Sequence, residues 1–490
     1  MQDPNTDQTV TSDAPPGPGS LPSEAKGQAT FDRRTFLTGA AGLAATGLGA
    51  RTLGLASRAA PLRYRSGRLS AKPMTFLNFY APGNAQPPLQ VKWFEKLVAD
   101  WNKTHTPRVQ LQYIPSGSYM NGPNVYTQFA SGHGPDIFLI SPGDFTRYAN
   151  GNIYVDLSDH MTAEARADYY SGVIASRTVN GKIYALPMEV EPMAFYYSVD
   201  AFEKAHLSEA DLPKTWAELL DVAKRVAGPK RFGVQFETIP GYYQNFTWYP
   251  FLWETRNFVV DKNGKTSGMA THGAEQALAL WHDAVQSGVA PRKSGGSGGF
   301  DIIGGLASGY CAIQNCGIWG IAALRQEAPH FRYGVFKLPV PPGGKYGTIL
   351  GGWAFAANAK GSNPDAAAEF CVWALGSMDP ASIQRGYEWI GVAKSDIAPR
   401  KSVLKLANQH GVYSSGPMKY FRDVVFPGGR GEPRFPPPVY EAVSTAIQAT
   451  QLGSTSPATA AEMAVSTING YLSGYSGIPV SDQAEAITTL

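Results

Sequence analysis

Hydrophobic positions beyond residue 72 follow two spacings in turn. Three short runs predict strands: Met74–Tyr80, Val109–Ile114 and Asp136–Ile140. The third run is short and continuously apolar, as expected for a buried strand of a parallel sheet. Between the first two runs, apolar side chains recur three and four positions apart and predict a helix with one buried face: Phe94, Leu97, Val98 and Trp101. Strand, helix and strand in this order predict a parallel α/β sheet.

The second half of the chain also shows signals for helices and loops. Thr215 and Glu218 have the spacing of a capping box and predict the start of a helix. Two stretches rich in Gly or Pro predict loops. Ser294–Gly299 is expected to be flexible, and Pro427–Pro438 is expected to form an irregular loop fixed at the surface.

Polar residues follow two of the predicted strands. Ligands of open α/β sheets bind beyond the carboxyl ends of the strands. Asn78 and Tyr80 end the first run, and Ser141 and Asp144 follow the third. These four residues are therefore expected to lie at or near a ligand site.

The N-terminal segment carries an export pattern. Arg33 and Arg34 precede a weakly apolar run, rich in Gly and Ala, that ends at Ala50. This pattern predicts a twin-arginine signal, so residues 1–60 are interpreted as a disordered leader with that signal. The run is shorter than the ~20 strongly apolar residues of a membrane span. The protein is expected in the periplasm or at the outer face of the cytoplasmic membrane, tethered there if the signal stays uncleaved.

Composition excludes one large class of partner. The 490 residues include 42 basic and 39 acidic side chains, which leave a formal charge of +3, and 43% of the residues are apolar. No dense block of Lys and Arg supplies the electrostatic pattern of a nucleic-acid-binding protein. The chain beyond the leader is long enough for roughly two domains with their own cores.

Cysteine and histidine patterns predict neither disulfides nor a metal site. Cys311 and Cys316 lie five positions apart on a strand-like run, too far apart to bond, and Cys371 fits a buried helical position. The eight histidines show no ligand spacing. Without a dinucleotide or phosphate-binding fingerprint, we expect no metal, no cofactor and no redox activity.

Aromatic side chains are abundant, with 24 Tyr, 23 Phe and 10 Trp. Most of these rings belong to the core of any fold. The excess of Tyr and Trp nevertheless suits the apolar faces of sugar rings, whose hydroxyl groups Asp, Glu, Asn and Gln can bind.

Several segments occur along the chain in one order: GPDIFLISPGDFTRYA, GKIYALPMEVEPMAFYYSVDAF, PKTWAELL, NFTWYPFLW, GIWG, FRYGVFKLPVPPGG and GGWAFAANAK. In this order they resemble the extracellular solute-binding proteins of ABC importers, in the carbohydrate-binding family that includes maltose-binding protein. The resemblance covers roughly residues 72–480.

This resemblance implies two α/β lobes, a hinge that the chain crosses three times, and a ligand in the cleft between the lobes. Residues 72–188 and 341–377 are expected to form lobe 1, and residues 192–338 and 380–486 to form lobe 2. Such a protein binds its ligand, closes over it and presents it to the membrane subunits of an ABC permease. We expect it to act as a monomer.

The resemblance places Glu191 at the hinge, at a ligand-contacting position, and Glu189 lies two residues earlier on the same side of an extended segment. Three interpretations remain open for this pair. The carboxylates bind ligand hydroxyl groups through charge-assisted hydrogen bonds, they form salt bridges that hold the hinge, or they act as general acid and base.

Further ligand contacts are carried over from the family segments. Trp248 matches the family's stacking tryptophan, with core packing as the alternative, and Gly352 would let a ligand approach the backbone. The remaining candidates are aromatic or acidic residues on segments that line the family's cleft: Tyr80, Asp144, Tyr243, Trp319, Trp353 and Trp389.

No Arg or Lys adjoins these positions in the sequence, so a neutral mono- or oligosaccharide or polyol is favoured over an anionic ligand. A cationic ligand such as a polyamine also fits carboxylates and aromatic rings. The other alternative is an exported carbohydrate-active enzyme that uses Glu189 and Glu191. Neighbours on one strand only approximate the opposed carboxylates of glycosidases, so we expect a binding protein without catalysis.

Overall fold

The computed structural model describes residues 72–83, 86–121 and 124–480. The predicted leader and twin-arginine signal lie outside these residues. None of the helices in the described ranges is both long and apolar enough to cross a membrane.

The first sheet has five strands in the order β2-β1-β3-β12-β6. Its three neighbouring strands β2, β1 and β3 are parallel, as the sequence pattern predicts, whereas β12 runs antiparallel to both of its neighbours. The bounds are β1 Met74–Asn78, β2 Val109–Tyr113, β3 Ile137–Ile140, β6 Leu186–Pro187 and β12 Ala354–Ala357. A separate hairpin pairs β4 Thr178–Val179 with β5 Lys182–Ile183.

The second sheet has six strands, in the order β13-β11-β7-β9-β8, with β10 also paired to β7. Its long central strand β7 is buried along its whole length. The bounds are β7 Glu191–Ser198, β8 Phe232–Gln235, β9 Cys311–Gly317, β10 Tyr333–Phe336, β11 Thr348–Gly351 and β13 Gly429–Gly431.

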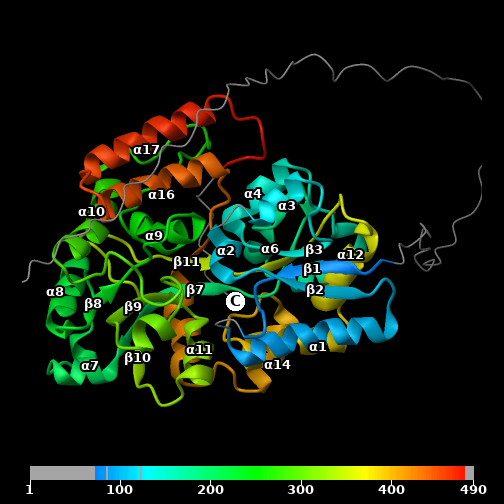
Figure 1. The fold of residues 1–490 in the computed structure, drawn as a ribbon, viewed down its shortest axis with the longest axis horizontal. Helices are drawn as coiled ribbons and strands as arrows, with labels where there is room; N and C mark the ends of the chain where they lie inside the picture. The colour runs from blue at the N-terminus through cyan, green and yellow to red at the C-terminus, as the bar shows by residue number, and fades with distance from the viewer. Residues whose placement is uncertain (1–71, 84–85, 122–123, 481–490) are drawn as a thin grey trace, which may run out of the picture. The chain divides into compact units, whose positions relative to one another are not determined.

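Helices pack around both sheets (Figure 1). Those within residues 88–175 and 364–409 are α1 Pro88–Thr104, α2 Ser116–Asn121, α3 Asn124–Ala130, α4 Pro142–Asn150, α5 Ala163–Asp168, α6 Ser171–Ala175, α12 Pro364–Cys371, α13 Pro380–Tyr387 and α14 Lys401–Gln409. Those within residues 199–327 and 416–472 are α7 Val199–Lys204, α8 Trp216–Val226, α9 Tyr242–Glu254, α10 His272–Gln286, α11 Gly320–Glu327, α15 Gly416–Tyr420, α16 Pro437–Gln451 and α17 Pro457–Leu472.

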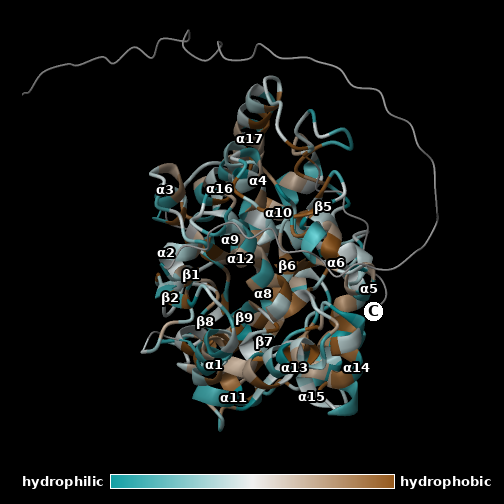
Figure 2. Cartoon of the chain, turned by 90° about the vertical axis from the view of Figure 1, so that its right-hand side faces the viewer, coloured by the Kyte–Doolittle hydropathy of each residue, from teal (hydrophilic) through white to brown (hydrophobic). Residues whose placement is uncertain are grey.

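Local sequence signals explain how individual helices begin and which face they bury. The predicted capping box is present at α8, where the side chains of Thr215 and Glu218 each bond the other residue's backbone amide. Figure 2 shows hydrophobic and hydrophilic stretches alternating along α8 and α14, as expected for helices that bury one face.

Two direct connections join the sheets. The chain passes from β6 to β7 through Met188–Val190, and from β11 to β12 through Gly352 and Trp353. The two connections lie next to each other, and the Met188 amide of one donates to the Trp353 carbonyl of the other at 3.0 Å. Glu189 and Glu191 therefore stand where the two sheets meet.

The prediction of an irregular surface loop at Pro427–Pro438 is wrong. Gly429–Gly431 forms strand β13, parallel to β11, and the following Glu432 and Phe435 are buried. A Cβ atom on Gly429 would lie 2.5 Å from the Leu350 side chain, so glycine is what allows this close pairing. The Gly- and Pro-rich composition thus reflects a tightly packed strand rather than a surface loop.

The predicted flexible loop Ser294–Gly299 is anchored by its backbone amides. Gly295 donates to Gln235 Oε1 at 2.8 Å, and Gly299 donates to Glu237 Oε2 at 2.9 Å. Side chains of the β8 strand and of the residues after it thereby replace the hydrogen bonds that regular structure would supply. Cys311, Cys316 and Cys371 are buried free thiols, as predicted.

Candidate functional site

A cavity of about 290 Å³ lies where the two sheets meet, next to the crossing segments. Aromatic rings from both halves of the fold form part of its walls. Six of them are Phe79, Tyr80, Tyr243, Phe246, Trp319 and Trp353. Rings on several sides give flat apolar surfaces that suit the face of a sugar or another ring-shaped ligand.

Charged side chains also line this cavity. Four of them are acidic and one is basic: Glu191, Asp301, Glu327, Glu432 and Lys394. Asp301 accepts hydrogen bonds from the amides of Ser297 and Gly304, and so fixes the adjacent Gly-rich loop. The two glutamates Glu191 and Glu432 are buried, so their charge depends on their immediate neighbours.

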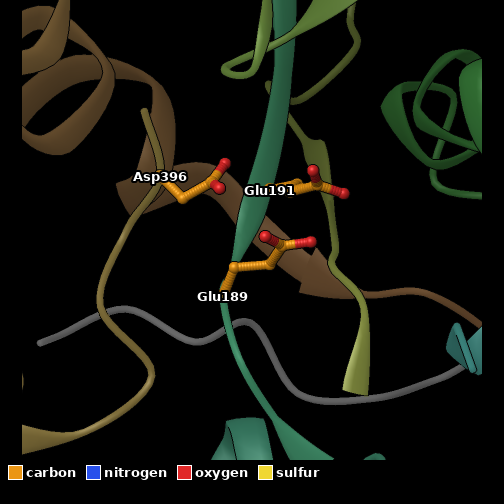
Figure 3. A group of neighbouring side chains, drawn as sticks. All are labelled: Glu189, Glu191 and Asp396. Carbon is orange, nitrogen blue, oxygen red and sulfur yellow. The ribbon is translucent and has the colours of Figure 1, made fainter. Parts of the chain in front are cut away.

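Lys394 lies inside a group of three carboxylates. Its Nζ atom is 2.9 Å from Glu189 Oε1 and 3.5 Å from Asp396 Oδ2, and it also donates to Glu191. Figure 3 shows Glu189 and Glu191 on one extended segment and Asp396 on the segment beside it. An antiparallel bridge between Val190 and Ile397 holds these two segments together.

Burial and mutual repulsion shape the charges of this group. Burial raises the pKa of Glu191 to about 7, against the opposing effect of Lys394. Burial also raises the pKa of Asp396 well above its usual range. Burial alone would lower the pKa of Lys394, but the carboxylates of Asp396, Glu189 and Glu191 raise it well above its ordinary value.

The three carboxylates are close enough for each to offer one oxygen to a common cation. The ammonium group of Lys394 supplies the positive charge there, with oxygens of all three residues within 4 Å. The arrangement is therefore a buried ion-pair network that joins the hinge segment to residues 394–396.

Two basic side chains adjoin the candidate positions in space. Lys394 reaches Glu191 across 203 positions of sequence. Arg177 is also buried, and it donates to the carbonyl of Gly352. Neither side chain is near these positions in the sequence, because strand pairing and the hinge segments bring them together.

Six of the ten predicted contact residues line the cavity: Tyr80, Glu191, Tyr243, Trp319, Gly352 and Trp353. Tyr243 stands on α9, and its buried hydroxyl has no hydrogen-bond partner among the described residues. Gly352 has a φ of 120°, and a Cβ atom there would lie 2.6 Å from the Glu189 carbonyl oxygen. Glycine is thus required where the second connection crosses the first.

Trp248 does not line the cavity. Its side chain is fully buried, and its indole N–H donates to the Ala277 carbonyl on α10 at 3.1 Å. On α9, Tyr243 and Phe246 share a face because they are three residues apart, whereas Trp248 is turned away from them. We therefore assign Trp248 to the core and remove it from the set of ligand contacts.

Three other predicted residues also stand outside the cavity lining. Trp389 is buried and donates to Glu189 Oε2 at 2.5 Å, so both side chains support the hinge. Asp144 accepts from Arg147 at 2.8 Å and from the Tyr440 hydroxyl at 3.1 Å. Its carboxylate therefore joins α4 to α16.

Glu432 is the main site residue that the sequence analysis missed. Its side chain is only 5% exposed, and it follows β13 in the stretch interpreted as a surface loop. Burial raises its pKa to about 8, against the opposing effects of the Arg177 charge and of a hydrogen bond from the Gly143 backbone. No local signal separates this glutamate from the exposed ones, because only the pairing of β13 with β11 buries it.

Residues 87–378 match the family described as bacterial extracellular solute-binding protein. The chain belongs to this family. Two relatives are an uncharacterized lipoprotein of Streptomyces antibioticus, 28% identical over 51% of this chain and 56% of the relative, and a galactooligosaccharide-binding protein of Bacillus subtilis, 26% identical over 56% and 64%. The chain thus spans little more than half of the Streptomyces relative.

Solved structures of solute-binding proteins share the two-lobed fold. One, from Thermotoga lettingae with bound α-D-tagatose, has a TM-score of 0.69 at 19% identity and covers 82% of this chain and 100% of its own. Another, a cyclic α-maltosyl-1,6-maltose binding protein from Arthrobacter globiformis, has a TM-score of 0.63 at 19% identity, with the same coverage. At this identity the likeness establishes the fold, and ligand assignment depends on the site.

Proposed function

We propose that this protein is the extracytoplasmic substrate-binding component of an ABC importer and that it binds a carbohydrate in the cavity between its two sheets. The observation that carries this proposal is the cavity lining. Aromatic rings such as Trp319 and Trp353 offer stacking surfaces, while Glu191 offers oxygen atoms to hydroxyl groups. Membership of the solute-binding family and a galactooligosaccharide-binding relative support the same assignment.

We propose two lobes, each built around one sheet. The sequence-based division puts residues 341–377 in lobe 1. Strand β11 within that range pairs with β7 and β13 of the six-stranded sheet, which supports a crossing at Gly352–Trp353 instead. Closure of the lobes about this crossing and the neighbouring Met188–Val190 segment would enclose a ligand and exclude water from its polar contacts.

The site is proposed to bind without chemistry. Glu189 and Glu191 both contact Lys394, and Glu189 does not line the cavity. A glycosidase needs two carboxyl groups on opposite sides of the scissile bond, about 5 to 9.5 Å apart. The neighbouring pair at the hinge is better suited to holding the crossing segment and, through Glu191, to ligand recognition.

Three further parts of the proposal concern the setting of the protein. The Arg33–Arg34 pattern supports export by the twin-arginine route, to the periplasm or the outer face of the membrane. The permease subunits of the importer are the proposed macromolecular partner. A single chain contains both sheets and the whole cavity lining, so a monomer suffices for binding.

Thermal unfolding of the purified protein against a panel of sugars tests the proposed function. A sugar at 100 times its dissociation constant is expected to raise the unfolding free energy by about 2.7 kcal/mol. Mass spectrometry after long incubation is expected to recover that sugar unchanged. Hydrolysed or oxidised product in large excess over protein would contradict a pure binding role.

A further inference from the structure

The acidic and basic groups of the cavity are unequal in number. Glu191 and Glu432 line it together with Lys394. The Lys394 ammonium already lies within 4 Å of oxygens of Glu189, Glu191 and Asp396. Lys394 is thus engaged by three other carboxylates, and the groups that favour the charged form of Glu432 are the Arg177 charge and the Gly143 backbone amide.

Glu432 forms no ion pair with any of the residues that the structure describes. Arg177 influences its pKa, yet the guanidinium group donates to the Gly352 carbonyl and the Ser176 hydroxyl instead. A carboxylate that faces a cavity from a buried position is costly when unpaired and gains most from a positive charge placed beside it.

The other walls of the cavity also favour a cation. Rings of Tyr243, Phe246, Trp319 and Trp353 line the same space. The electron-rich faces of aromatic rings attract cations within about 6 Å of the ring centre. Tyr243 adds a buried hydroxyl oxygen without a hydrogen-bond partner in the described part of the chain, so the site also has capacity for a polar ligand group.

We infer that the bound carbohydrate is an amino sugar whose protonated amine lies beside Glu432 against the aromatic walls. This inference rests on the proposed carbohydrate function and specifies its substrate class. An anionic sugar would meet Glu191 and Glu432 with like charge. A neutral or N-acetylated sugar would place no positive charge beside Glu432.

Binding of an amine beside Glu432 is expected to release protons, which can be measured independently of affinity. Burial raises the pKa of Glu432 to about 8, so this carboxyl group is largely protonated in the empty site at neutral pH. A neighbouring cation lowers a carboxyl pKa, and Glu191 and Asp144, the other acids that act on Glu432, respond in the same direction. Binding of an amine at about pH 7 is therefore expected to release protons, whereas a neutral sugar releases none.

Isothermal titration calorimetry with matched sugars tests the inference on the unmodified protein. Each set contains a sugar, its 2-amino-2-deoxy analogue and the N-acetylated analogue, as monosaccharides and as β-1,4-linked and α-1,4-linked disaccharides. In the set whose ring stereochemistry fits, the free amine is expected to bind about 10 to 100 times more tightly than the other two. Its heat should change with the ionisation enthalpy of the buffer, which reports the released proton.

Glu432→Gln preserves the shape of the side chain and removes its charge. This variant is expected to lose most of the preference for the amine, so that its affinities for the amine and for the neutral sugar become similar. Glu462→Gln, on the exposed face of α17, is the matched control and should retain the preference. Circular dichroism of both variants verifies that they are folded before binding is compared.

The other results separate this inference from the proposed function. Equal or tighter binding of the neutral member in every set would overturn the amino-sugar inference and leave the carbohydrate function intact. Binding of spermidine but of none of the sugars would contradict both. An amine preference that survives in Glu432→Gln would remove Glu432 as its cause and so overturn the inference as stated.

Discussion

Lys394 is the residue on which the buried charges at the hinge depend. Its ammonium group contacts carboxylates of Glu189, Glu191 and Asp396, and all four side chains are buried. Removing one partner of a buried ion pair costs more than the pair contributes, because the remaining charges have neither water nor counter-charge. The stability of the two crossing segments is therefore tied to one side chain.

We expect Lys394→Met to lower the unfolding free energy by about 3–5 kcal/mol near neutral pH. The loss should shrink towards about pH 5, because the buried carboxylates of Glu191 and Asp396, left without their counter-charge, can then take up protons in the folded state. Urea unfolding at both pH values measures this. Lys96→Met, at an exposed pair with Asp100, is the control and should change stability by less than about 0.5 kcal/mol. Equal effects of the two substitutions would contradict the network.

Glu432 is expected to make the unfolding free energy fall as the pH rises, whereas a salt-bridged acid makes it rise. Its pKa is about 8 in the folded protein, above the ordinary value of 4.5. A group whose folded pKa is raised contributes stability below its unfolded pKa, and that contribution is lost as the pH rises to the folded pKa. Between these limits one such group lowers stability by up to about 1.4 kcal/mol per pH unit.

Glutamine does not titrate, so Glu432→Gln lacks this loss of stability. The unfolding free energy of the variant should therefore increasingly exceed that of the unmodified protein from about pH 5 to about pH 8. Denaturant titrations in one buffer series measure the difference. A difference for Glu432→Gln that does not change with pH would contradict the raised pKa of this carboxyl group.

Helix α9 separates two kinds of aromatic residue that look alike in the sequence. Tyr243 and Phe246 face the cavity, whereas Trp248 packs towards α10 and is fully buried. The family motif NFTWYPFLW by itself does not say which face of the helix each aromatic side chain occupies. Applying the spacing of 3.6 residues per turn would have placed Trp248 on the opposite side from Tyr243.

Trp248→Ala is expected to cost about 3–5 kcal/mol of stability, because it empties a packed core site, and to leave the affinity of the folded fraction unchanged. Trp319→Ala provides the comparison, since its partly buried ring lines the cavity. That variant should lose affinity strongly at a smaller cost in stability. Calorimetric binding and urea unfolding of both variants decide the assignment, and a loss of affinity at Trp248 alone would reverse it.

The connection from β11 to β12 depends on glycine at position 352. With a φ of 120° and the Glu189 carbonyl close by, a side chain meets both backbone strain and a steric clash. We expect Gly352→Ala to destabilise the protein by about 1–3 kcal/mol. Gly470→Ala within α17, where nothing lies within 4 Å, should instead be neutral or stabilising by up to about 1 kcal/mol. Thermal unfolding distinguishes them, and similar effects would refute the steric argument.

At the scale of the whole molecule, we propose that export and binding depend on different parts of the chain. Lysine in place of both Arg33 and Arg34 keeps the charge and removes the paired guanidinium groups. We expect this double variant to remain in the cytoplasm while Arg63→Lys is exported normally, as measured by cell fractionation and immunoblotting. Unimpaired export of the double variant would exclude the twin-arginine route.

The sequence by itself was sufficient for the parallel core of the first sheet and for the capping box of α8. Both are set by neighbours a few residues apart, through short apolar runs and side-chain-to-backbone hydrogen bonds. The resemblance to the solute-binding family also led to Glu191 and Trp353, because both stand beside direct connections between the sheets.

Only the tertiary structure decided the charges and the limits of the site. Lys394 reaches Glu191 from 203 positions away, and Glu432 becomes buried because β13 adds to the edge of β11. The spacing of residues along the chain does not predict these contacts, since they depend on which segments pair in the two sheets. A carboxylate or a tryptophan looks the same in sequence whether it faces a cavity, a core or water, and burial together with the neighbouring charges determines which role it has.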